Sequence, residues 1–398
     1  MVCLAGQLVL RSELLRRVPM ENSKINVVVD GVIYGSQARG GISRLFSEIL
    51  LRMCEVDDSL HITLLTKGRL KQALPQHQRI THRSIPNIER YLRPKRIWKS
   101  LIPAADGLIQ KVLVGQGSGK VWHSTYYTLL QGWRGHSVVT VHDMIFERFR
   151  DFYSGPSADR FRERKKQCIC NADAVICVSE TTRRDVKSFY DLDSDSIYVV
   201  PHACSDVFRQ LEQSADTSTL PTDQPFLLYV GVRSPYKNFG MLIQAYSKWR
   251  RRKEVALVLV GERPWPDEGR RQLAQLQIQN RVQLLQDVDD ETLCRLYNKT
   301  AAFVFPSLYE GFGIPLLEAM TCGCPIVASR IPSTIEVAGD CPIYFNPMEE
   351  DDLLNALDVA LFEGRNSERV RAGLERVKSY SWDKTAAETL EVYRAVCS

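Results

Sequence analysis

The sequence of 398 residues contains no run approaching the ~20 consecutive apolar residues that a membrane-spanning helix needs. It also contains no solenoid-type repeat, no low-complexity tract and no recognised nucleic-acid-binding module, so we expect no nucleic-acid partner. At the start, a short apolar run precedes the basic residues, the reverse of the order in a secretory signal. The length predicts about two globular domains.

The eleven cysteines show no metal-binding spacing. The C-x-C pairs Cys168/Cys170 and Cys322/Cys324 lack the partner pairs that zinc sites use. We therefore expect no metal site, and reduced core thiols in a cytoplasmic protein. The acidic segment 191–195 (DLDSD) resembles the triplet of metal-dependent transferases, but it lacks the glycine and distal glutamate of a calcium loop, which favours a solvated loop.

The formal net charge of +5 is unevenly distributed. Residues 1–205 hold 30 Lys and Arg against 20 Asp and Glu, whereas residues 206–398 hold 22 against 27. Two basic stretches, 90–99 (RYLRPKRIWK) and 160–166 (RFRERKK), lie in the first half. Such stretches favour an acidic acceptor or peripheral contact with the anionic inner face of a membrane, where each cation contributes about 1 kcal/mol. A solvated helix face explains the second stretch equally well.

Short apolar, β-branched runs separated by helical or irregular segments predict an α/β fold with two parallel sheets. These runs are 25–30, 61–65, 138–142, 175–178 and 198–200 in the first half, and 226–230, 256–260, 281–285, 301–305 and 326–328 in the second. A polar, turn-rich segment at 206–224 predicts a linker. The predicted boundaries are an extension at 1–24 with Met20 as an alternative start, a first domain at 25–205, a second domain at 225–380 and a final helix at 381–398.

Several local signals predict helices between these strands. A helix over 42–54 follows Gly40 and Gly41, Asp289 is placed to cap the helix that runs through Tyr297, and Ser333 with Glu336 has the spacing of a capping box. The closing helices are expected at 351–362, 367–379 and 383–396.

The segment 305–329, FPSLYEGFGIPLLEAMTCGCPIVAS, combines a strand end, a glycine-rich turn and a helix start. Pro315 fits the first helical turn and Gly323 the helix stop. Gly311 and Gly313 let a ligand approach the backbone, and the free N–H groups of the helix start favour an anion such as a diphosphate. Glu310 on the turn and Glu318 within the helix are about 10 Å apart by helical rise, more than the roughly 5 to 9.5 Å of a hydrolase pair.

These motifs, together with YVGVRSPYKN, RVQLLQDVDDETLCRLY and GGISR, resemble the retaining glycosyltransferases of the GT-B group, family 4 (group 1 glycosyl transferases), which include bacterial mannosyl- and glucosyltransferases. The similarity extends from about Asn26 onward. It implies two Rossmann-like, doubly wound domains that face a central cleft, the first for the acceptor and the second for the nucleotide-sugar. It also implies that the last one or two helices pack back on the first domain.

The resemblance implies roles for the residues that follow strands, where doubly wound sheets bind ligands. The sugar would lie against Glu310 and His142, the ribose on Glu318, and the diphosphate on Arg233, Lys237 and the helix start. Tyr236 stands where many relatives carry an arginine, so the family pattern supports Lys237 more directly than Arg233. His123 and His202 are weaker candidates. The remaining donor-binding candidates are Gly311, Phe312, Gly313, Ile314, Gly40, Gly41, Asn238 and, near the base, Val288 in 287–293.

The function implied is metal-independent transfer of a hexose, with mannose from GDP-mannose favoured, to a glycan or lipid-linked acceptor of a surface polysaccharide. No cofactor beyond the nucleotide-sugar donor is expected. Retention of configuration would follow from front-face attack by the acceptor, with Glu310 as nucleophile or stabiliser left open. The alternatives are a transferase that uses UDP-glucose or another UDP-sugar, a GT-B epimerase or phosphorylase, and an inactive binding subunit.

Overall fold

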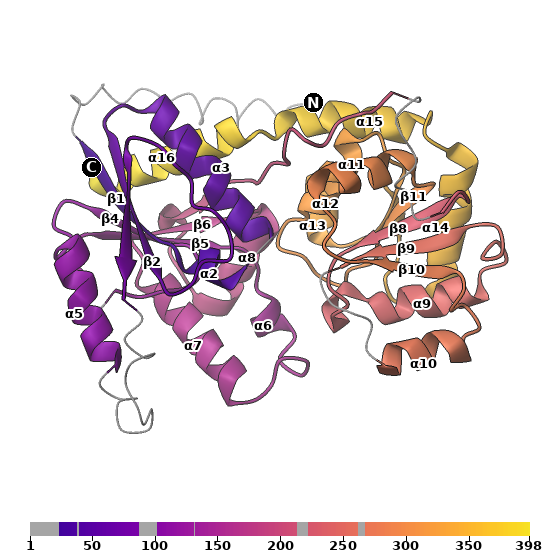
Figure 1. The fold of residues 1–398 in the computed structure, drawn as a ribbon, viewed down its shortest axis with the longest axis horizontal. Helices are drawn as coiled ribbons and strands as arrows, with labels where there is room; N and C mark the ends of the chain where they lie inside the picture. The colour runs from indigo at the N-terminus through magenta and orange to yellow at the C-terminus, as the bar shows by residue number, and fades with distance from the viewer. Residues whose placement is uncertain (1–23, 38–39, 87–101, 131, 213–221, 262–266) are drawn as a thin grey trace.

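The computed structural model describes residues 24–37, 40–86, 102–130, 132–212, 222–261 and 267–398. Within these residues the chain forms two α/β domains side by side, each with a parallel sheet flanked by helices (Figure 1). The predicted α/β fold with two doubly wound sheets is therefore confirmed. The predicted extension, the basic stretch 90–99 and much of the predicted linker lie outside the described residues.

The first domain contains, among its described residues, a parallel sheet in the order β3-β2-β1-β4-β5-β6-β7. Its strands are β1 (Ile25–Asp30), β2 (Leu60–Lys67), β3 (Ile80–Ile85), β4 (Val121–Ser124), β5 (His136–Val141), β6 (Ala174–Cys177) and β7 (Ile197–Val199). Its helices are α2 (Val32–Ser36), α3 (Gly41–Val56), α5 (Ile102–Val114), α6 (Ile145–Arg148), α7 (Pro156–Cys170) and α8 (Glu180–Tyr190), with the short 3-10 turn η2 (Ser194–Ser196).

The second domain contains a parallel sheet in the order β10-β9-β8-β11-β12-β13. Its strands are β8 (Phe226–Val230), β9 (Ala256–Val260), β10 (Val282–Leu285), β11 (Ala302–Phe305), β12 (Ile326–Ser329) and β13 (Ile343–Phe345). Its helices are α9 (Phe239–Lys248), α10 (Asp267–Gln275), α11 (Asp290–Lys299), α12 (Ile314–Thr321), α13 (Pro332–Ala338), α14 (Glu350–Glu363) and α15 (Glu368–Arg376), with 3-10 turns η3 (Pro235–Lys237) and η4 (Val377–Ser379).

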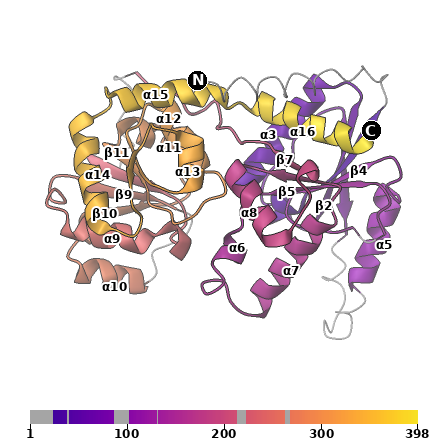
Figure 2. The same cartoon turned by 180° about the vertical axis from the view of Figure 1, so that it is seen from behind.

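The last helix, α16 (Trp382–Cys397), leaves the second domain and lies on the first (Figure 1). Its buried residues Trp382, Leu390 and Tyr393 belong to the same apolar cluster as Val27 of β1 and Phe46 of α3. In the reverse view α16 lies along the first domain, and α8 of the first domain and α13 of the second lie next to each other where the two domains meet (Figure 2). Three segments of chain that are far apart in sequence therefore join the domains.

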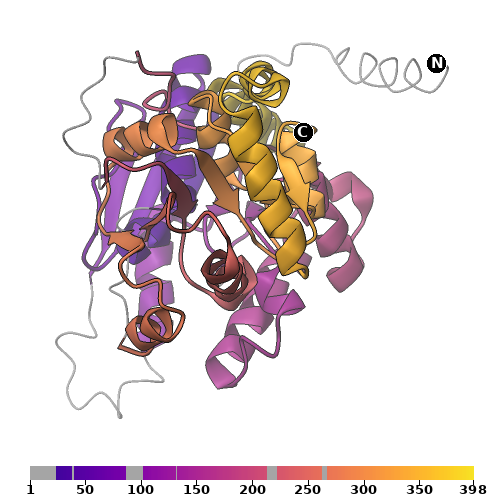
Figure 3. The same cartoon turned by 90° about the vertical axis from the view of Figure 1, so that its right-hand side faces the viewer.

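Each sheet reverses its strand order once near its centre, between β1 and β4 in the first domain and between β8 and β11 in the second. In open parallel sheets, ligands bind beyond the carboxyl ends of the strands at such a reversal. Viewed along the long axis of the molecule, one domain lies behind the other (Figure 3). Because the strand order of the second sheet reverses between β8 and β11, we expect a ligand site at the loops that follow these two strands.

One local prediction is wrong. Ser333 and Glu336 do not form a capping box, because Pro332 starts α13 and places Ser333 inside it. The Glu336 carboxylate instead accepts hydrogen bonds from the backbone N–H groups of Glu180 (2.6 Å) and Thr181 (2.8 Å), at the start of α8 in the other domain. Glu336 therefore accepts hydrogen bonds from the free N–H groups at the start of α8, a helix of the other domain, and not from its own helix. By contrast, Asp289 caps α11 as predicted, through Thr292 N at 2.8 Å.

Candidate active site between the domains

Two residues predicted for the donor site, Lys237 and Glu310, form an ion pair. Lys237 lies in η3, after β8, and its Nζ is 2.6 Å from Oε1 of Glu310, which lies after β11. The hydroxyl of Ser307 donates a hydrogen bond to the same oxygen at 2.6 Å. The side chains of Lys237 and Glu310 are only 13% and 10% exposed. Two central strands of the second sheet thus place opposite charges side by side in a largely dehydrated position.

The glycine turn after Glu310 is held by the first domain. The carbonyl oxygen of Gly311 accepts hydrogen bonds from the hydroxyls of Ser179 (2.5 Å) and Thr182 (3.1 Å). A Cβ at position 311 would lie 1.8 Å from the carbonyl oxygen of His142. No real side chain tolerates that distance, so this position requires glycine. In this structure the close neighbour of Gly311 is the backbone of the other domain.

Tyr309, just before the turn, adds a second interdomain connection. Its hydroxyl donates to Oδ2 of Asp185 at 2.7 Å and accepts from the backbone N–H of Met144 at 3.1 Å. Asp185 is also paired with Arg148, whose Nε lies 3.0 Å from the same oxygen. Burial raises the pKa of Tyr309, so its hydroxyl stays protonated and able to donate. The loop that carries Glu310 is therefore fixed to the first domain on both sides.

His142 follows β5, and its ring lies in the domain interface. Nε2 is 3.0 Å from the carbonyl oxygen of Thr125, so Nε2 carries the hydrogen, because a carbonyl can only accept. Nδ1 is buried and has no hydrogen-bond partner in the described structure. Burial lowers the pKa of His142 to about 4, which leaves the ring neutral at pH 7. A neutral ring with an unused acceptor nitrogen can take a hydrogen bond from a hydroxyl.

His202 and His123 lie near His142 but have structural surroundings. The ring of His202 stacks on that of His142 at 6.3 Å and meets the edge of Phe312 at 5.2 Å. His123 bridges Thr140 Oγ1 at 2.8 Å and the hydroxyl of Tyr393 in α16 at 2.6 Å. Burial lowers the pKa of both rings to about 3. Both are neutral side chains, His202 against Phe312 of the second domain and His123 between the first sheet and α16.

Glu318, in α12, is 6% exposed and has a partner on each carboxylate oxygen. The hydroxyl of Tyr297 donates to Oε2 at 3.1 Å, and Nη1 of Arg44, from α3 of the first domain, is 3.3 Å from Oε1. Burial raises the pKa of Glu318 to about 7, against the lowering effect of the Arg44 charge. This carboxylate is therefore poised between its two protonation states near neutral pH.

The start of α12 faces the first domain. Gly313, the residue before the helix, has φ = 112°, a conformation suited to glycine. A Cβ at Gly41 would lie 3.1 Å from Cδ1 of Ile314, so the starts of α3 and α12 almost touch. Both helix starts direct backbone N–H groups toward this junction, which suits an anionic group.

Comparison with known proteins agrees with this arrangement. A family model described as Glycosyl transferases group 1 matches residues 212–372, and one described as Glycosyltransferase Family 4 matches residues 40–205. O-antigen chain mannosyltransferase B from Escherichia coli is 30% identical over 269 residues, which cover 65% of this chain and 70% of that relative. The chain belongs to glycosyltransferase family 4. It is therefore a hexose-transferring enzyme of the GT-B group, and the family predicted from the sequence is confirmed.

Two further matches agree. Serotype-specific mannosyltransferase WbdA from Escherichia coli is 31% identical over 269 residues, which cover 64% of this chain but only 33% of that longer relative. The solved structure of HepE from Anabaena, in complex with UDP and glucose, superposes with a TM-score of 0.72 at 17% identity, and the match covers 93% of this chain and 100% of that one. The second match confirms the GT-B fold.

Four more predicted donor residues of the family 4 enzyme lie in loops or next to helix starts. Arg233, in the loop after β8, places its guanidinium against Gly261 at the end of β9. Asn238 adopts φ = 55° and donates its side-chain amide to the carbonyl oxygen of Pro347 at 2.8 Å, which fixes the turn after Lys237. Val288 precedes α11 and is half-buried. Gly40 is the residue before α3.

The sequence does not indicate the residues around the glutamates. Ser307, Tyr297 and Arg44 each contact a predicted carboxylate. Ser307 precedes Glu310 by three residues, and this closeness is the one signal that could identify it as a neighbour. Arg44 lies within the GGISR motif, but its contact with Glu318 joins positions 274 residues apart, and no local signal reveals it.

The other predicted features lie away from this site. In the basic stretch 160–166, Lys165 is not part of a solvated or membrane-facing surface: it is 1% exposed and pairs with Glu147 at 2.8 Å. The acidic residues of 191–195 are exposed. The described part of the chain contains no group of His, Cys, Asp and Glu that could hold a metal ion, and none of its helices is long and apolar enough to span a bilayer.

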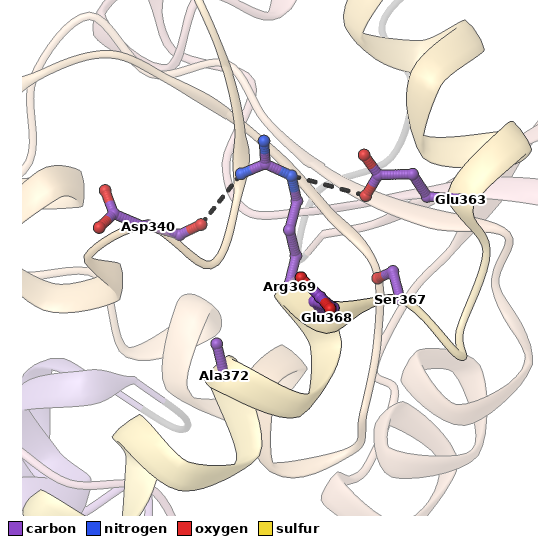
Figure 4. A pocket seen from close by; sticks show the side chains of 6 residues that line it. All are labelled: Asp340, Glu363, Ser367, Glu368, Arg369 and Ala372. Atoms are coloured by element: carbon purple, nitrogen blue, oxygen red, sulfur yellow. Dashed lines mark hydrogen bonds and ion pairs between the residues drawn. The ribbon is translucent and has the colours of Figure 1, made fainter.

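A surface hollow of about 550 Å³ opens in the second domain near α15. It is lined by Asp340, Glu363, Ser367, Glu368, Arg369 and Ala372 (Figure 4). Arg369 donates to the backbone carbonyl of Asp340 at 3.0 Å and pairs with Glu363 at 3.5 Å. None of the predicted donor residues lines it, so this hollow is separate from the site between the domains.

Proposed function

We propose that this glycosyltransferase moves mannose from GDP-mannose to a glycan or lipid-linked acceptor of a surface polysaccharide, with retention of anomeric configuration and without a metal ion. The observation that carries the proposal is the contact of Lys237 and Glu310 at 2.6 Å, beside the glycine turn that begins α12. The names of the two mannosyltransferase relatives support mannose as the sugar.

The donor would occupy the junction of the two domains. Its diphosphate would lie at Lys237, Arg233 and the start of α12, where two cations and free N–H groups offset negative charge. Its ribose diol would donate hydrogen bonds to Glu318, and its base would lie near 287–293. The sugar would rest between Glu310 and His142, whose Nδ1 would accept a hydrogen bond from a sugar hydroxyl.

The reaction would break the bond between C1 of the sugar and the diphosphate oxygen, and form a bond between C1 and an acceptor oxygen on the same face. The acceptor proton would pass to the departing diphosphate oxygen. Lys237 would stabilise the charge that develops on this leaving group, and Glu310 the positive charge on the sugar. The dry surroundings of this ion pair would strengthen both effects and exclude water as a competing acceptor.

Ligand-induced stabilisation provides the test. We expect GDP-mannose and GDP to raise the melting temperature of the wild-type protein, because a ligand at 100 times its Kd adds about 2.7 kcal/mol of stability. UDP-glucose and ADP-glucose should do so less, and Lys237→Ala or Glu318→Ala should remove the shift. A full shift with both variants, or none with any of these nucleotides near millimolar concentration, would refute the proposed donor site.

A transfer assay separates the remaining alternatives. With GDP-mannose and mannose-terminated oligosaccharides we expect release of GDP and a new α-linked mannose, detected by NMR. An epimerase would change the donor in the absence of any acceptor, and an inactive binding subunit would show a thermal shift without product. Either result would contradict the proposed transfer.

A further inference from the structure

Arg44 is a side chain of the first domain that reaches the buried glutamate of the second. Its Nη2 lies 2.6 Å and 2.7 Å from the two carboxylate oxygens of Asp290, at the start of α11, and its Nη1 lies 3.3 Å from Oε1 of Glu318. The guanidinium also lies over the ring of Phe208, 5.9 Å from its centroid. One planar cation therefore joins three elements of the interface.

The local sequence explains why Arg44 can make this contact. Gly41, the first residue of α3, lies against Ile314, the first residue of α12, so the two helices start at the same junction. Arg44 is one turn into α3 and Glu318 is one turn into α12. The absence of a side chain at Gly41 lets the helices approach closely enough for the guanidinium to span the gap.

The contacts of Glu318 leave room for a ligand. An ionised carboxylate offers about four acceptor positions, and Tyr297 and Arg44 use one on each oxygen. A pair of ribose hydroxyls would fill the remaining two. A protonated carboxyl would lose an acceptor position and could not serve both hydroxyls equally.

The charges that face Glu318 oppose one another. Burial and Asp290 raise the pKa of Glu318, and Arg44 and the Tyr297 hydroxyl lower it, with a net rise to about 7. Burial, with a smaller contribution from Glu318, raises the pKa of the nearby Cys204 thiol to about 11, so this thiol remains uncharged. Among these groups, Arg44 brings the positive charge that favours the carboxylate.

We propose that Arg44 is a positioning residue for the donor, which orients Glu318 and keeps it ionised so that both ribose hydroxyls find an acceptor. Since Arg44 belongs to the first domain, the ribose-binding carboxylate is competent only when the two domains meet. This inference rests on the proposed function, because it requires Glu318 to bind the ribose.

The test is the pH dependence of GDP binding, measured by calorimetry between pH 6 and pH 9. In Arg44→Met the midpoint of the binding profile should rise by about one pH unit or more, since a neighbouring opposite charge shifts a pKa by that amount. GDP should bind about five- to tenfold more weakly than to wild type at pH 7 and recover at pH 9. Arg44→Lys should recover part of the loss.

Asp290→Asn is the matched control, because it breaks the same interdomain bridge but removes a negative charge. In Asp290→Asn the midpoint of the pH profile of GDP binding should move to lower pH, whereas in Arg44→Met it should move to higher pH. If Arg44 only held the two domains together, both variants would weaken GDP binding by the same factor at every pH, and neither midpoint would move. That result would overturn the inference.

A nucleotide without ribose hydroxyls isolates the contact further. Wild type should bind 2′,3′-dideoxy-GDP more weakly than GDP, whereas Arg44→Met at pH 7 should bind the two almost equally. An undiminished preference for GDP in Arg44→Met would refute the role of Arg44. The proposed function would fail separately, if wild type bound neither GDP nor UDP or if Glu318→Ala bound GDP as wild type does.

Discussion

Replacement of Lys237 by methionine tests the ion pair on which the proposed chemistry depends. The substitution keeps the apolar stem and leaves Glu310, 10% exposed, without its cation. Removal of one partner of a buried pair costs about 3–5 kcal/mol. Because Ser307 still donates to Glu310 and both side chains retain some exposure, we expect a loss near the low end, about 3 kcal/mol, in the free energy of unfolding.

The double variant Lys237→Met/Glu310→Gln separates stability from catalysis. It removes the stranded carboxylate, so guanidinium unfolding should show a coupling energy of about 2 kcal/mol and partial recovery of stability. Turnover should stay about 10²- to 10³-fold below wild type in the single and the double variant, because the leaving diphosphate has lost its cation.

Lys165→Met provides a control at a second, more deeply buried ion pair. Lys165 pairs with Glu147 at 2.8 Å, both almost fully buried, so its loss should destabilise the protein at least as much. We expect this variant to retain transfer activity within about tenfold of wild type at a temperature where it is folded. Recovery of turnover in the double variant, or equal losses of activity in Lys165→Met and Lys237→Met, would refute a chemical role for Lys237.

Four further substitutions have expected outcomes. Gly311→Ala would drive a methyl group into the His142 carbonyl and should cost about 1–3 kcal/mol. At Gly240 a methyl group would enter open space, so Gly240→Ala should change the free energy of unfolding by less than about 1 kcal/mol. Equal losses of stability in the two variants would contradict the close contact between Gly311 and the His142 carbonyl. Because the pKa of Glu318 is raised from 4.5 to about 7, the folded protein holds an extra proton between these values and loses about 3 kcal/mol as pH rises through them. Unfolding of Glu318→Gln should lack this slope, and an unchanged slope would refute the assignment. Because burial lowers the pKa of His202 from 6.5 to about 3, stability should fall with pH below 6.5, and His202→Phe should reduce the fall between urea midpoints at pH 7 and pH 5. An identical fall of the urea midpoint in His202→Phe would contradict the lowered pKa of His202.

The sequence predicts the central strands well because each is a continuous apolar run buried on both faces, as in β8 and β9. Its apolar pattern does not reveal three other strands. In β3 (ITHRSI), polar residues lie at the exposed edge of the first sheet, β4 (VWHS) contains only two apolar residues, and β13 (IYF) contains three residues at the edge of the second sheet. Short or edge strands carry too little apolar periodicity to stand out from loops.

For the candidate site, the rule that ligands bind beyond strand ends directs attention to Lys237 and Glu310 from the sequence alone. It does not reveal that the two are in contact, because this depends on how far the loops after β8 and β11 extend toward each other. Contacts between the domains escape sequence-based prediction for a further reason. Glu336 has the local pattern of a capping residue, yet its carboxylate binds the start of α8. The interface brings it next to two backbone N–H groups of α8 that have no acceptor within that helix.

The placement of α16 has a consequence for synthesis of the protein. The ribosome makes the first domain early, but an apolar face around α3 is covered by residues of the last helix, including Leu390 and Tyr393. Until α16 has been synthesised and has left the ribosome, that face remains exposed and able to bind chaperones or other nascent chains. The first domain is therefore complete only after the second domain and α16 have been translated, and a premature stop codon before α16 would leave the apolar face around α3 uncovered.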